Sequence, residues 1–405
     1  MSLFRSLKQG SFTLLWIGQT LSRVGDFIYE IALAWWVLEK TASAQTMGLV
    51  LVFSITPSLI FLLIGGVVVD RLPRIPLMLF SDIGRGIAAL IVSALAFSGE
   101  LQVWHVYVAS LFFGFVMAFF QPAYSAIVPQ IVPKDDLPSA NALTSISANL
   151  GRVAGPALGA VIVGGLGSTV AFALNGLSFL ISAAFLIPLL SARIGAPDSS
   201  HSEENDVWQE MRQGFVTVLA SPWLWISIII FSLVNVTLIG PYYVAMPFLV
   251  SDFMKADVNR LGLLYSIFPI GFVIGGAWLG RYQKLPRRGM LMYITLALAA
   301  LMLGLYGFHL PLWMLIIAAL VNGIALQFSS LAWTNLLQER IPNEQLGRVS
   351  SIDAMGSISL MPVGMALAGW ATVAFGPALV FIVGGALTAL VGITAMLHPA
   401  IRALD

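Results

Sequence analysis

The sequence predicts an all-α membrane protein whose twelve transmembrane helices form two six-helix, pseudo-symmetric halves. Three observations support this fold class. Of the 405 residues, 59% are apolar and only 10% are charged, whereas soluble domains are about 25% charged. Twelve apolar runs are long enough to cross a bilayer, which takes about 20 residues. Finally, short sequences from the first half of the chain return in the second half.

Each apolar run is expected to be a helix, because at this length only a helix satisfies its own backbone hydrogen bonds in lipid. In chain order, the runs are 12–38, 46–69, 76–98, 103–128, 139–166, 169–190, 222–250, 260–281, 289–308, 311–336, 347–372 and 376–397. Proline occurs inside four of them, where we expect kinks rather than loops, at Pro57, Pro122, Pro156 and Pro362.

The basic residues orient these helices, because Lys and Arg concentrate in cytoplasmic loops. With the N-terminus in the cytoplasm, only Lys40, Lys255 and Arg260 lie outside. The basic residues inside are then Arg5, Lys8, Arg71, Arg74, Lys134, Arg193, Arg212, Arg281, Lys284, Arg287, Arg288, Arg340, Arg348 and Arg402. We therefore expect a multi-pass protein of the cell's inner (cytoplasmic) membrane with both termini in the cytoplasm. The N-terminal stretch MSLFRSLKQGSF lacks a short apolar core, so no removable signal peptide is expected.

A polar, acidic stretch divides the chain into an N-terminal half, residues 1–190, a cytoplasmic linker, 191–221, and a C-terminal half, 222–405. Apolar residues recur in the linker at helical spacing, at Val207, Met211, Phe215, Val218 and Leu219. This spacing predicts an amphipathic helix on the cytoplasmic face of the membrane. The alternative is a solvated linker with one or two helical turns.

The two halves repeat each other in sequence. IGGVVVDR at 64–71 returns as IGGAWLGR at 274–281, and VPKDDL at 132–137 returns as IPNEQL at 341–346. The first pair is 210 residues apart and the second 209, and the offset of 209 also aligns Gly114 with Gly323. Parallel repeats of this kind place a substrate site between the halves, near the middle of the membrane, and their rocking gives alternating access.

Composition excludes several kinds of protein. The chain has no Cys, a net charge of only +1 and four scattered His residues, so we expect no metal, no cofactor and no nucleic-acid partner. An enzyme is disfavoured because no G-x-S-x-G or Walker A sequence is present, and no catalytic residue is predicted. The expected partners are a small-molecule substrate, protons and the lipid bilayer, and the expected state is a monomer.

The loop after the second run, GGVVVDRLPRIP, contains Gly66, Asp70, Arg71 and Arg74 at the spacing G-x-x-x-D-R-x-x-R. This loop resembles the signature of the major facilitator superfamily, except that Pro73 replaces the usual Gly. The acid is placed to meet a helix N-terminus, and the arginines to hold the cytoplasmic face. The resemblance implies a latch that one conformation makes and the other breaks. A simple positively charged cytoplasmic loop is the alternative.

The fifth run contains GRVAGPALGA, with Gly151, Gly155, Pro156 and Gly159 at the spacing G-x3-G-P-x2-G. This pattern resembles the helix-five motif of drug–proton antiporters in the same superfamily, which is associated with export. Small residues four positions apart also allow ordinary tight helix packing, which is the alternative interpretation.

Longer stretches resemble one branch of the superfamily, the macrolide-efflux and enterobactin-exporter-like group, over about residues 4–385. The stretches are LLWIGQTLSRVGDF, FFQPAYSAIVPQIVPKDDLPSANAL, ASPWLWISIII and NLLQERIPNEQLGRVSS. The resemblance implies a proton-coupled antiporter for multidrug efflux, exporting lipophilic or amphiphilic molecules such as antibiotics and conferring resistance. The alternatives are a dedicated exporter of a siderophore or other metabolite and, less favoured, a membrane-embedded enzyme. Whether protons or sodium drive transport stays open.

Charges occur deep inside the first run, in SRVGDFIYEIALAWW at 22–36. Positions 23, 26 and 30 share a narrow face of a helix, and a charge at this depth is expected to be functional because insertion costs about 2.5–3.5 kcal/mol. We predict that Asp26 and Glu30 carry the coupled proton, with Arg23 and Arg152 as exchangeable partners. A static pair between Arg23 and either acid is the alternative. Two further expectations are a structural Asp82–Arg85 pair and an Asp353 that joins the latch. If helix one does not carry the proton, Asp82 or Asp353 is the next candidate.

Large or polar residues on the fourth, seventh and tenth runs and on the first complete the expected site, because these four helices line the cavity in this superfamily. The candidates are Tyr29, Phe113, Phe119, Gln121, Asn235, Tyr242, Gln327 and Trp333. Aromatic side chains suit bulky lipophilic ligands, although packing is the alternative role for each.

Overall fold

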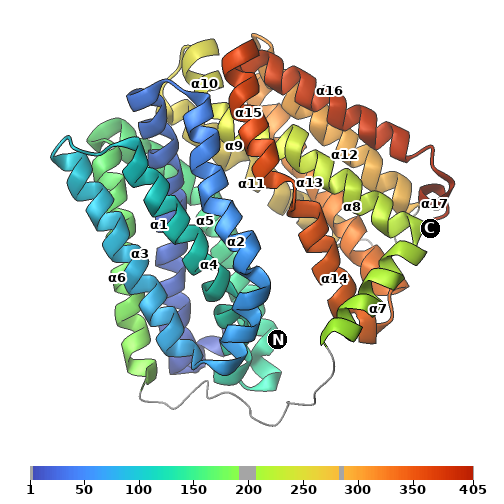
Figure 1. Ribbon diagram of the computed structural model, residues 1–405, viewed down its shortest axis with the longest axis horizontal. Coiled ribbons are helices and arrows are strands. Elements are labelled where there is room, and N and C mark those ends of the chain that lie inside the picture. Colours follow the sequence, from blue (N-terminus) through green and yellow to red (C-terminus); the bar gives the residue numbers. More distant parts are fainter. Residues whose placement is uncertain (1–2, 191–206, 282–286, 405) are drawn as a thin grey trace. The chain divides into compact units, whose positions relative to one another are not determined.

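The computed structural model describes residues 3–190, 207–281 and 287–404, with the side chains of 62–67, 70, 207–211 and 343 outside the description. Every regular element in the described ranges is helical (Figure 1), which confirms the all-α fold class. The α-helices are α1 Gly10–Thr41, α2 Ala44–Arg71, α3 Arg74–Phe97, α4 Val103–Ile131, α5 Leu137–Leu166, α6 Ser168–Leu190, α7 Val207–Ala220, α8 Pro222–Val234, α9 Gly240–Val244, α10 Met246–Phe248, α11 Val258–Leu279, α12 Arg288–Gly304, α13 Leu312–Arg340, α14 Asn343–Ile358, α15 Met361–Phe375, α16 Pro377–Ala395 and α17 Pro399–Arg402. Two π-helical turns, η3 Asn235–Ile239 and η4 Leu249–Phe253, lie between them.

Eleven spans within the described ranges are long and apolar enough to cross a membrane. Helix α1 is not one of them, because Arg23, Asp26 and Glu30 interrupt its apolar sequence. At 32 residues, or about 48 Å at 1.5 Å per residue, α1 is nevertheless long enough to span a bilayer. It also packs along α5 and α6, which makes α1 the twelfth helix of the predicted set.

The chain forms two compact units. Unit 1 comprises residues 1–42, 49–200 and 257–266, and unit 2 comprises 43–48, 201–256 and 267–405. In unit 1, α6 packs against both α1 and α3, while α5 covers another side of α1 and α4 packs on α3 (Figure 1). Gly18 allows α1 to approach α6, since a Cβ there would lie 3.2 Å from Ser182 Cα. The apolar core is fully buried, as Phe12, Leu15, Ile127 and Leu143 illustrate.

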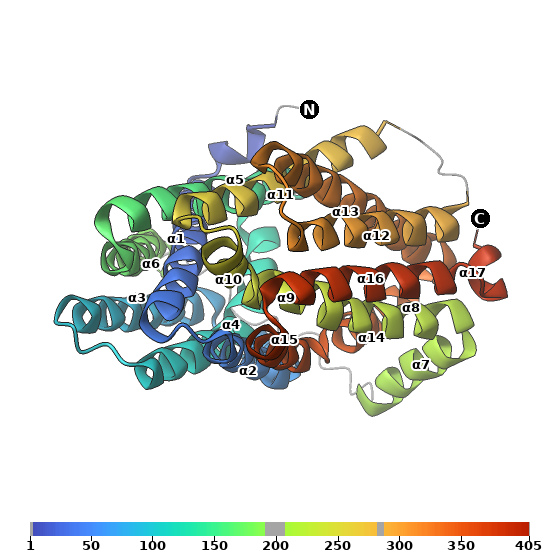
Figure 2. The ribbon, with the colours of Figure 1, turned by 90° about the horizontal axis from the view of Figure 1, so that it is seen from above.

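In unit 2, α12 packs between α13 and α16 (Figure 2). Two buried polar contacts tie its helices together. The hydroxyls of Ser227 on α8 and Tyr293 on α12 are 2.7 Å apart, and Asn322 on α13 donates a 2.6 Å hydrogen bond to the Ala299 carbonyl. Each contact satisfies a buried polar group within the membrane span, where water is not available to do so.

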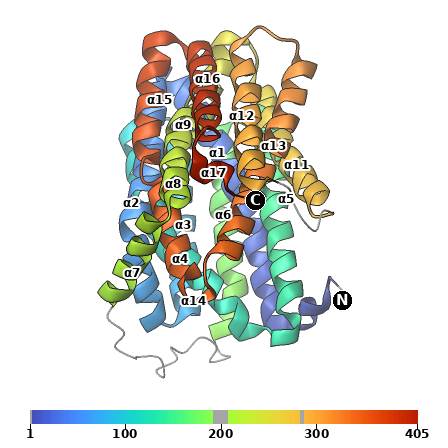
Figure 3. The same ribbon diagram turned by 90° about the vertical axis from the view of Figure 1, so that its right-hand side faces the viewer.

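Two of the predicted helices are interrupted. The run expected at 222–250 consists of α8, η3, α9, α10 and η4, and the run expected at 347–372 is divided into α14 and α15 (Figure 3). Asn235, the first residue of η3, donates hydrogen bonds of 2.9 Å to the carbonyls of Phe231 and Ser357. The side-chain amide thus holds the π-helical turn against α14. Such turns are frequent at functional sites.

The repeated glycines make the same kind of helix contact in both units. A Cβ on Gly114 of α4 would collide with the carbonyl oxygen of Ser54 on α2, and a Cβ on Gly323 of α13 would collide with that of Phe268 on α11. Backbone atoms cannot move aside cheaply, so glycine is required at both positions. The α2–α4 and α11–α13 pairs are therefore equivalent crossings.

The amphipathic segment of the linker forms α7, which packs on α14 and α8. Thr217 donates a 2.9 Å hydrogen bond to Gln345, and Arg348 donates one of 3.1 Å to Gln213. Gly214 faces the side chain of Ile352. Residues 191–206 of the predicted linker lie outside the described residues.

Candidate functional site

The three charged residues in the middle of α1 are half-buried, but Arg23 does not pair with an acid in the described part of the chain. Its Nη1 donates a 3.1 Å hydrogen bond to the Thr144 carbonyl on α5. Its guanidinium carbon lies 5.0 Å from the centre of the Tyr124 ring on α4, a cation–π distance. Arg23 is thus held by uncharged groups.

Asp26 lies among several polar side chains, none of which forms an ion pair with it within the described ranges. The charges of Arg85 and Asp82 act on its carboxylate, and that of Arg23 acts more weakly. Asn175, fully buried on α6, also faces Asp26. The Asn175 Nδ2 has no hydrogen bond of ordinary length among the described groups. Its N–H groups are therefore available to donate to the Asp26 carboxyl.

Glu30 lies one turn further along α1, and two charged groups act on it. The charge of Asp26 acts first and that of Arg152 second. Arg152 is exposed on α5, and no ion pair joins it to Glu30 in the portion that the structure describes. The two acids on α1 are therefore neighbours that influence each other electrostatically.

A fully satisfied acid lies next to them. Asp82 on α3 pairs with Arg85 at 2.6 Å and accepts hydrogen bonds from Gln19 and Ser182 at 3.1 and 2.8 Å. The guanidinium carbon of Arg85 lies 4.4 and 4.2 Å from the ring centres of two phenylalanines, Phe120 and Phe179. Both charged residues are buried. Helices α1, α3, α4 and α6 all contribute to this network.

Tyr29 and Phe113, two predicted cavity residues, pack together in unit 1. Their ring centres are 5.5 Å apart, and Phe172 lies 5.2 Å from Tyr29. The Tyr29 hydroxyl is buried without a hydrogen-bond partner among the described residues. Tyr29 lies between Asp26 and Glu30 in sequence, so this aromatic cluster adjoins the two acids.

The predicted helix-five motif forms the contact between α5 and α1. A Cβ on Gly155 would collide with Phe27 Cβ, and one on Gly159 would lie 3.1 Å from Ile28 Cα. Gly151 faces the ring of Phe27. Pro156 instead presents its carbonyl to Gly262 on α11. The motif thereby fixes the side of α1 that neighbours the acids.

The predicted latch is only partly visible. Gly66 and Asp70 belong to α2, but the surroundings of Gly66 and the side chain of Asp70 lie outside the description. Arg71 is exposed. Arg74, at the start of α3, donates a 3.4 Å hydrogen bond to the Ala126 carbonyl on α4.

A cavity of about 330 Å³ lies within unit 2. Two predicted residues, Asn235 and Trp333, line it together with Asp353. The Trp333 indole donates a 2.8 Å hydrogen bond to Asp353 Oδ2, and the Ser357 hydroxyl donates one of 3.2 Å to Oδ1. The Phe231 ring lies 5.1 Å from that of Trp333. The cavity thus combines aromatic walls with one oriented carboxylate.

The other predicted cavity residues do not line this space. Phe119 packs against Phe115, with ring centres 5.1 Å apart, and Tyr242 packs against Phe268 at 5.7 Å. Gln121 is exposed. Gln327 lies against Gly275 on α11, and its Oε1 is buried without a partner in the described portion.

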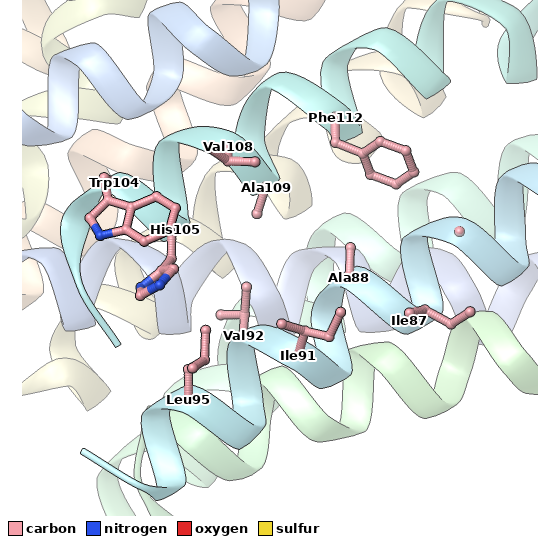
Figure 4. A pocket seen from close by; sticks show the side chains of 11 residues that line it. Ile87, Ala88, Ile91, Val92, Leu95, Trp104, His105, Val108, Ala109 and Phe112 are labelled. Carbon is pink, nitrogen blue, oxygen red and sulfur yellow. The ribbon is translucent and has the colours of Figure 1, made fainter. Parts of the chain in front are cut away.

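A larger cavity, of about 440 Å³, lies between α3 and α4 (Figure 4). Ile91 and Val108 line it and are more than half exposed, as expected for a groove that faces lipid. Its only titratable lining residue, His105, accepts the backbone N–H of Gln102 and caps α4. We therefore place the candidate site elsewhere.

Sequence reasoning missed Ser357 and Phe231 and left Asp353 without a ligand-binding role. The available signal was spacing: Asp353 and Ser357 are four residues apart, as are Phe231 and Asn235, so each pair shares a helix face. Polar residues on one face of an apolar helix point toward the protein interior.

Solved structures of similar shape support the class of protein. The chain matches a bacterial homologue of the iron transporter ferroportin with a TM-score of 0.73 and 15% identity, covering 98% of this chain and 99% of that one. It matches the nucleoside transporter NupG with a TM-score of 0.74 and 13% identity, covering 96% and 98%. The chain therefore has the twelve-helix fold of the major facilitator type.

Sequence relatives narrow the class. The chain belongs to the transmembrane secretion effector family, whose model matches residues 1–325. It is 24% identical to macrolide efflux protein A of Streptococcus pyogenes over 97% of both chains. It is 26% identical to the enterobactin exporter EntS of Escherichia coli O6:K15:H31 (strain 536 / UPEC), covering 89% of this chain and 84% of that one. These relatives support an exporter.

Proposed function

We propose that the chain is a proton-coupled antiporter that exports lipophilic or amphiphilic small molecules by alternating access, from a bacterial inner membrane with both termini in the cytoplasm. The observation that carries the coupling is the state of Asp26 and Glu30. Both are half-buried in the middle of α1, and neither forms an ion pair with the described residues around it.

The contrast with Asp82 supports this role. Asp82 has Arg85, Gln19 and Ser182 as partners, so its charge is compensated. Asp26 and Glu30 form no ion pair in the described part of the chain, because Arg23 binds a carbonyl and an aromatic ring instead, and the neighbour that hydrogen-bonds to Asp26 is the neutral Asn175. An uncompensated acid in a membrane span gains from binding a proton, since the charged form is costly there. Alternate exposure to the two sides would then carry that proton across.

The available energy is sufficient for export. A proton that enters down a membrane potential supplies about 2.3 kcal/mol per 100 mV. Because 1.4 kcal/mol corresponds to a factor of ten, one proton exchanged for one neutral solute at 100 mV supports roughly a fortyfold concentration gradient of that solute. The helix-five motif would keep α1 and α5 aligned during the cycle, and the loop with Asp70, Arg71 and Arg74 would act as the latch.

The experiment is export of a macrolide by the purified full chain in proteoliposomes with an imposed pH gradient. Asp26→Asn, Glu30→Gln and the double variant keep side-chain shape and remove the titrating group. We expect at least one to abolish gradient-driven accumulation while passive exchange continues. Glu100→Gln removes an exposed carboxylate and serves as the control. Wild-type accumulation by the double variant would remove α1 from the coupling mechanism.

A dedicated siderophore exporter is the second candidate, favoured by the likeness to the enterobactin exporter over most of its length. Transport of a catecholate siderophore and of a macrolide by the same proteoliposomes separates the two. Selective export of the catecholate, without competition by lipophilic drugs, would favour the dedicated exporter.

A further inference from the structure

The cavity in unit 2 contains a negative charge that the described part of the protein leaves without a counter-ion. Asp353 is the one charged residue among those that line it. No Lys or Arg lies within ion-pair distance of its carboxylate in the described ranges. An isolated carboxylate in such a setting is costly unless it binds a proton or a cation compensates it.

The carboxylate is oriented by neutral donors. Trp333 from α13 binds Oδ2 and Ser357 from the next turn of α14 binds Oδ1. Hydrogen bonds of this kind stabilise a charged carboxylate and fix its direction. They occupy one site on each oxygen, and a carboxylate oxygen can accept more than one hydrogen bond. Acceptor capacity is thus left for a ligand.

The walls around Asp353 are aromatic and aliphatic. The ring of Trp333 meets that of Phe231 edge to face at 5.1 Å, and Trp223 supports Trp333 from outside the cavity at 5.7 Å. The aliphatic lining residues are Val234, Ile239, Leu296, Leu326, Ala354 and Ile358. Indole rings bind cations through their faces, and the volume of about 330 Å³ is within the range of small-molecule sites, about 300–1,000 Å³.

The polar groups near the carboxylate do not compete for this role. The Asn235 amide already donates to two carbonyls. Ser329 and Ser330 also line the cavity and carry no charge. The neighbouring helices α8, α13 and α14 therefore supply an apolar cavity with one fixed anion.

We propose that this cavity binds an organic cation, a molecule with an apolar body and one protonated amine, with Asp353 as its counter-ion. The inference rests on the proposed exporter function for its biological meaning, because the bound cation would be a transported compound. The binding step itself is independent of how transport is driven.

The test is binding of two probes to the purified full chain in lipid nanodiscs. One probe is naphthylethyl-dimethylamine, and the other is its carbon isostere, in which CH replaces the protonated nitrogen. The wild type is expected to bind the amine at least tenfold more tightly at pH 7. Asp353→Asn should abolish that preference and leave affinity for the isostere within twofold. Glu100→Gln, which removes the same charge outside the cavity, should retain the preference.

Ser357→Ala and Trp333→Phe each remove one donor to Asp353, and each should weaken amine binding about threefold or more without affecting the isostere. Equal binding of both probes by the wild type would overturn the proposal, even if Asp353→Asn fails to fold. So would a preference that survives in Asp353→Asn. Efflux assays separate this result from the function: gradient-driven export of a neutral macrolide without amine preference contradicts the cation site and leaves the exporter intact.

Discussion

Asp82 and Arg85 form a 2.6 Å ion pair one turn apart on α3, and the guanidinium lies against the rings of Phe120 and Phe179. Asp82→Asn should therefore destabilise the protein strongly, because it leaves a buried positive charge unpaired, at about 3–5 kcal/mol. Thermal unfolding in detergent measures this loss. The double variant Asp82→Asn/Arg85→Met should be more stable than Asp82→Asn alone. The reverse order would show that the pair is not what stabilises this network.

Gly155 on α5 should not tolerate a side chain. Gly155→Ala places a Cβ against Phe27 on α1, and overpacking of this kind costs about 1–3 kcal/mol. The matched control is Gly165→Ala near the end of the same helix, where a Cβ meets nothing within 4 Å, and its stability should be unchanged or slightly raised. Equal melting temperatures for the two alanine variants would contradict the packing role.

The docking of α7 on α14 should depend on Gly214. Gly214→Val places side-chain atoms against Ile352, since even a Cβ would lie 2.8 Å from its Cδ1. We expect faster amide hydrogen exchange over 212–220 in this variant. Gly347→Ala on α14 is the control, because a Cβ there meets nothing within 4 Å. Unchanged protection in Gly214→Val would show that α7 is held by other contacts.

Asp257, which precedes α11, offers a pH-dependent test outside the membrane spans. The Asn259 side chain donates a 3.0 Å hydrogen bond to its Oδ2, and this bond, with others from backbone N–H groups, lowers the pKa of the Asp257 carboxyl below 3.8. A lowered folded-state pKa means that its stabilising contribution is present above pH 3.8 and is lost as the pH falls through the folded-state pKa. NMR titration of the Asp257 carboxyl should give a folded-state pKa below 3.8. Asn259→Ala should move this pKa toward 3.8.

Eleven of the helices were predictable because each is long and apolar within the described ranges, and membrane insertion requires such runs. Helix α1 was predictable from its length, although its charges weaken the apolar signal; a functional role for these charges stays a prediction. The break between α14 and α15 agrees with the kink expected at Pro362, which lies in the first turn of α15 and has no N–H to continue the helix. The π-helical turn η3 was not predictable, since none of its five residues is a proline or glycine. A tertiary contact accompanies this turn: the amide of Asn235 bonds to the Ser357 carbonyl on α14.

The sequence predicted which residue types form the candidate site better than it predicted which residues contact one another there. Depth and helical face drew attention to Asp26 and Glu30, whose role in coupling stays a prediction. The expectation that Arg23 pairs with them could not foresee a competing carbonyl on α5, 121 residues away. Similarly, Asn235 and Trp333 were named as cavity residues, while their neighbour Asp353 was assigned to other roles. Contacts between distant helices decide which charges remain free, and spacing within one helix does not contain that information.

The matching glycine contacts, Gly114 against Ser54 and Gly323 against Phe268, have an evolutionary consequence. If one ancestral segment was duplicated, its backbone crossing has been retained in both copies, whereas its chemistry has diverged. The first copy now holds five deep charges on α1 and α3, and in the second the described cavity is lined by one carboxylate, that of Asp353. If both proposals hold, residues for proton coupling and residues for substrate choice lie on separate copies, and a lineage could acquire a new substrate without changing its coupling residues.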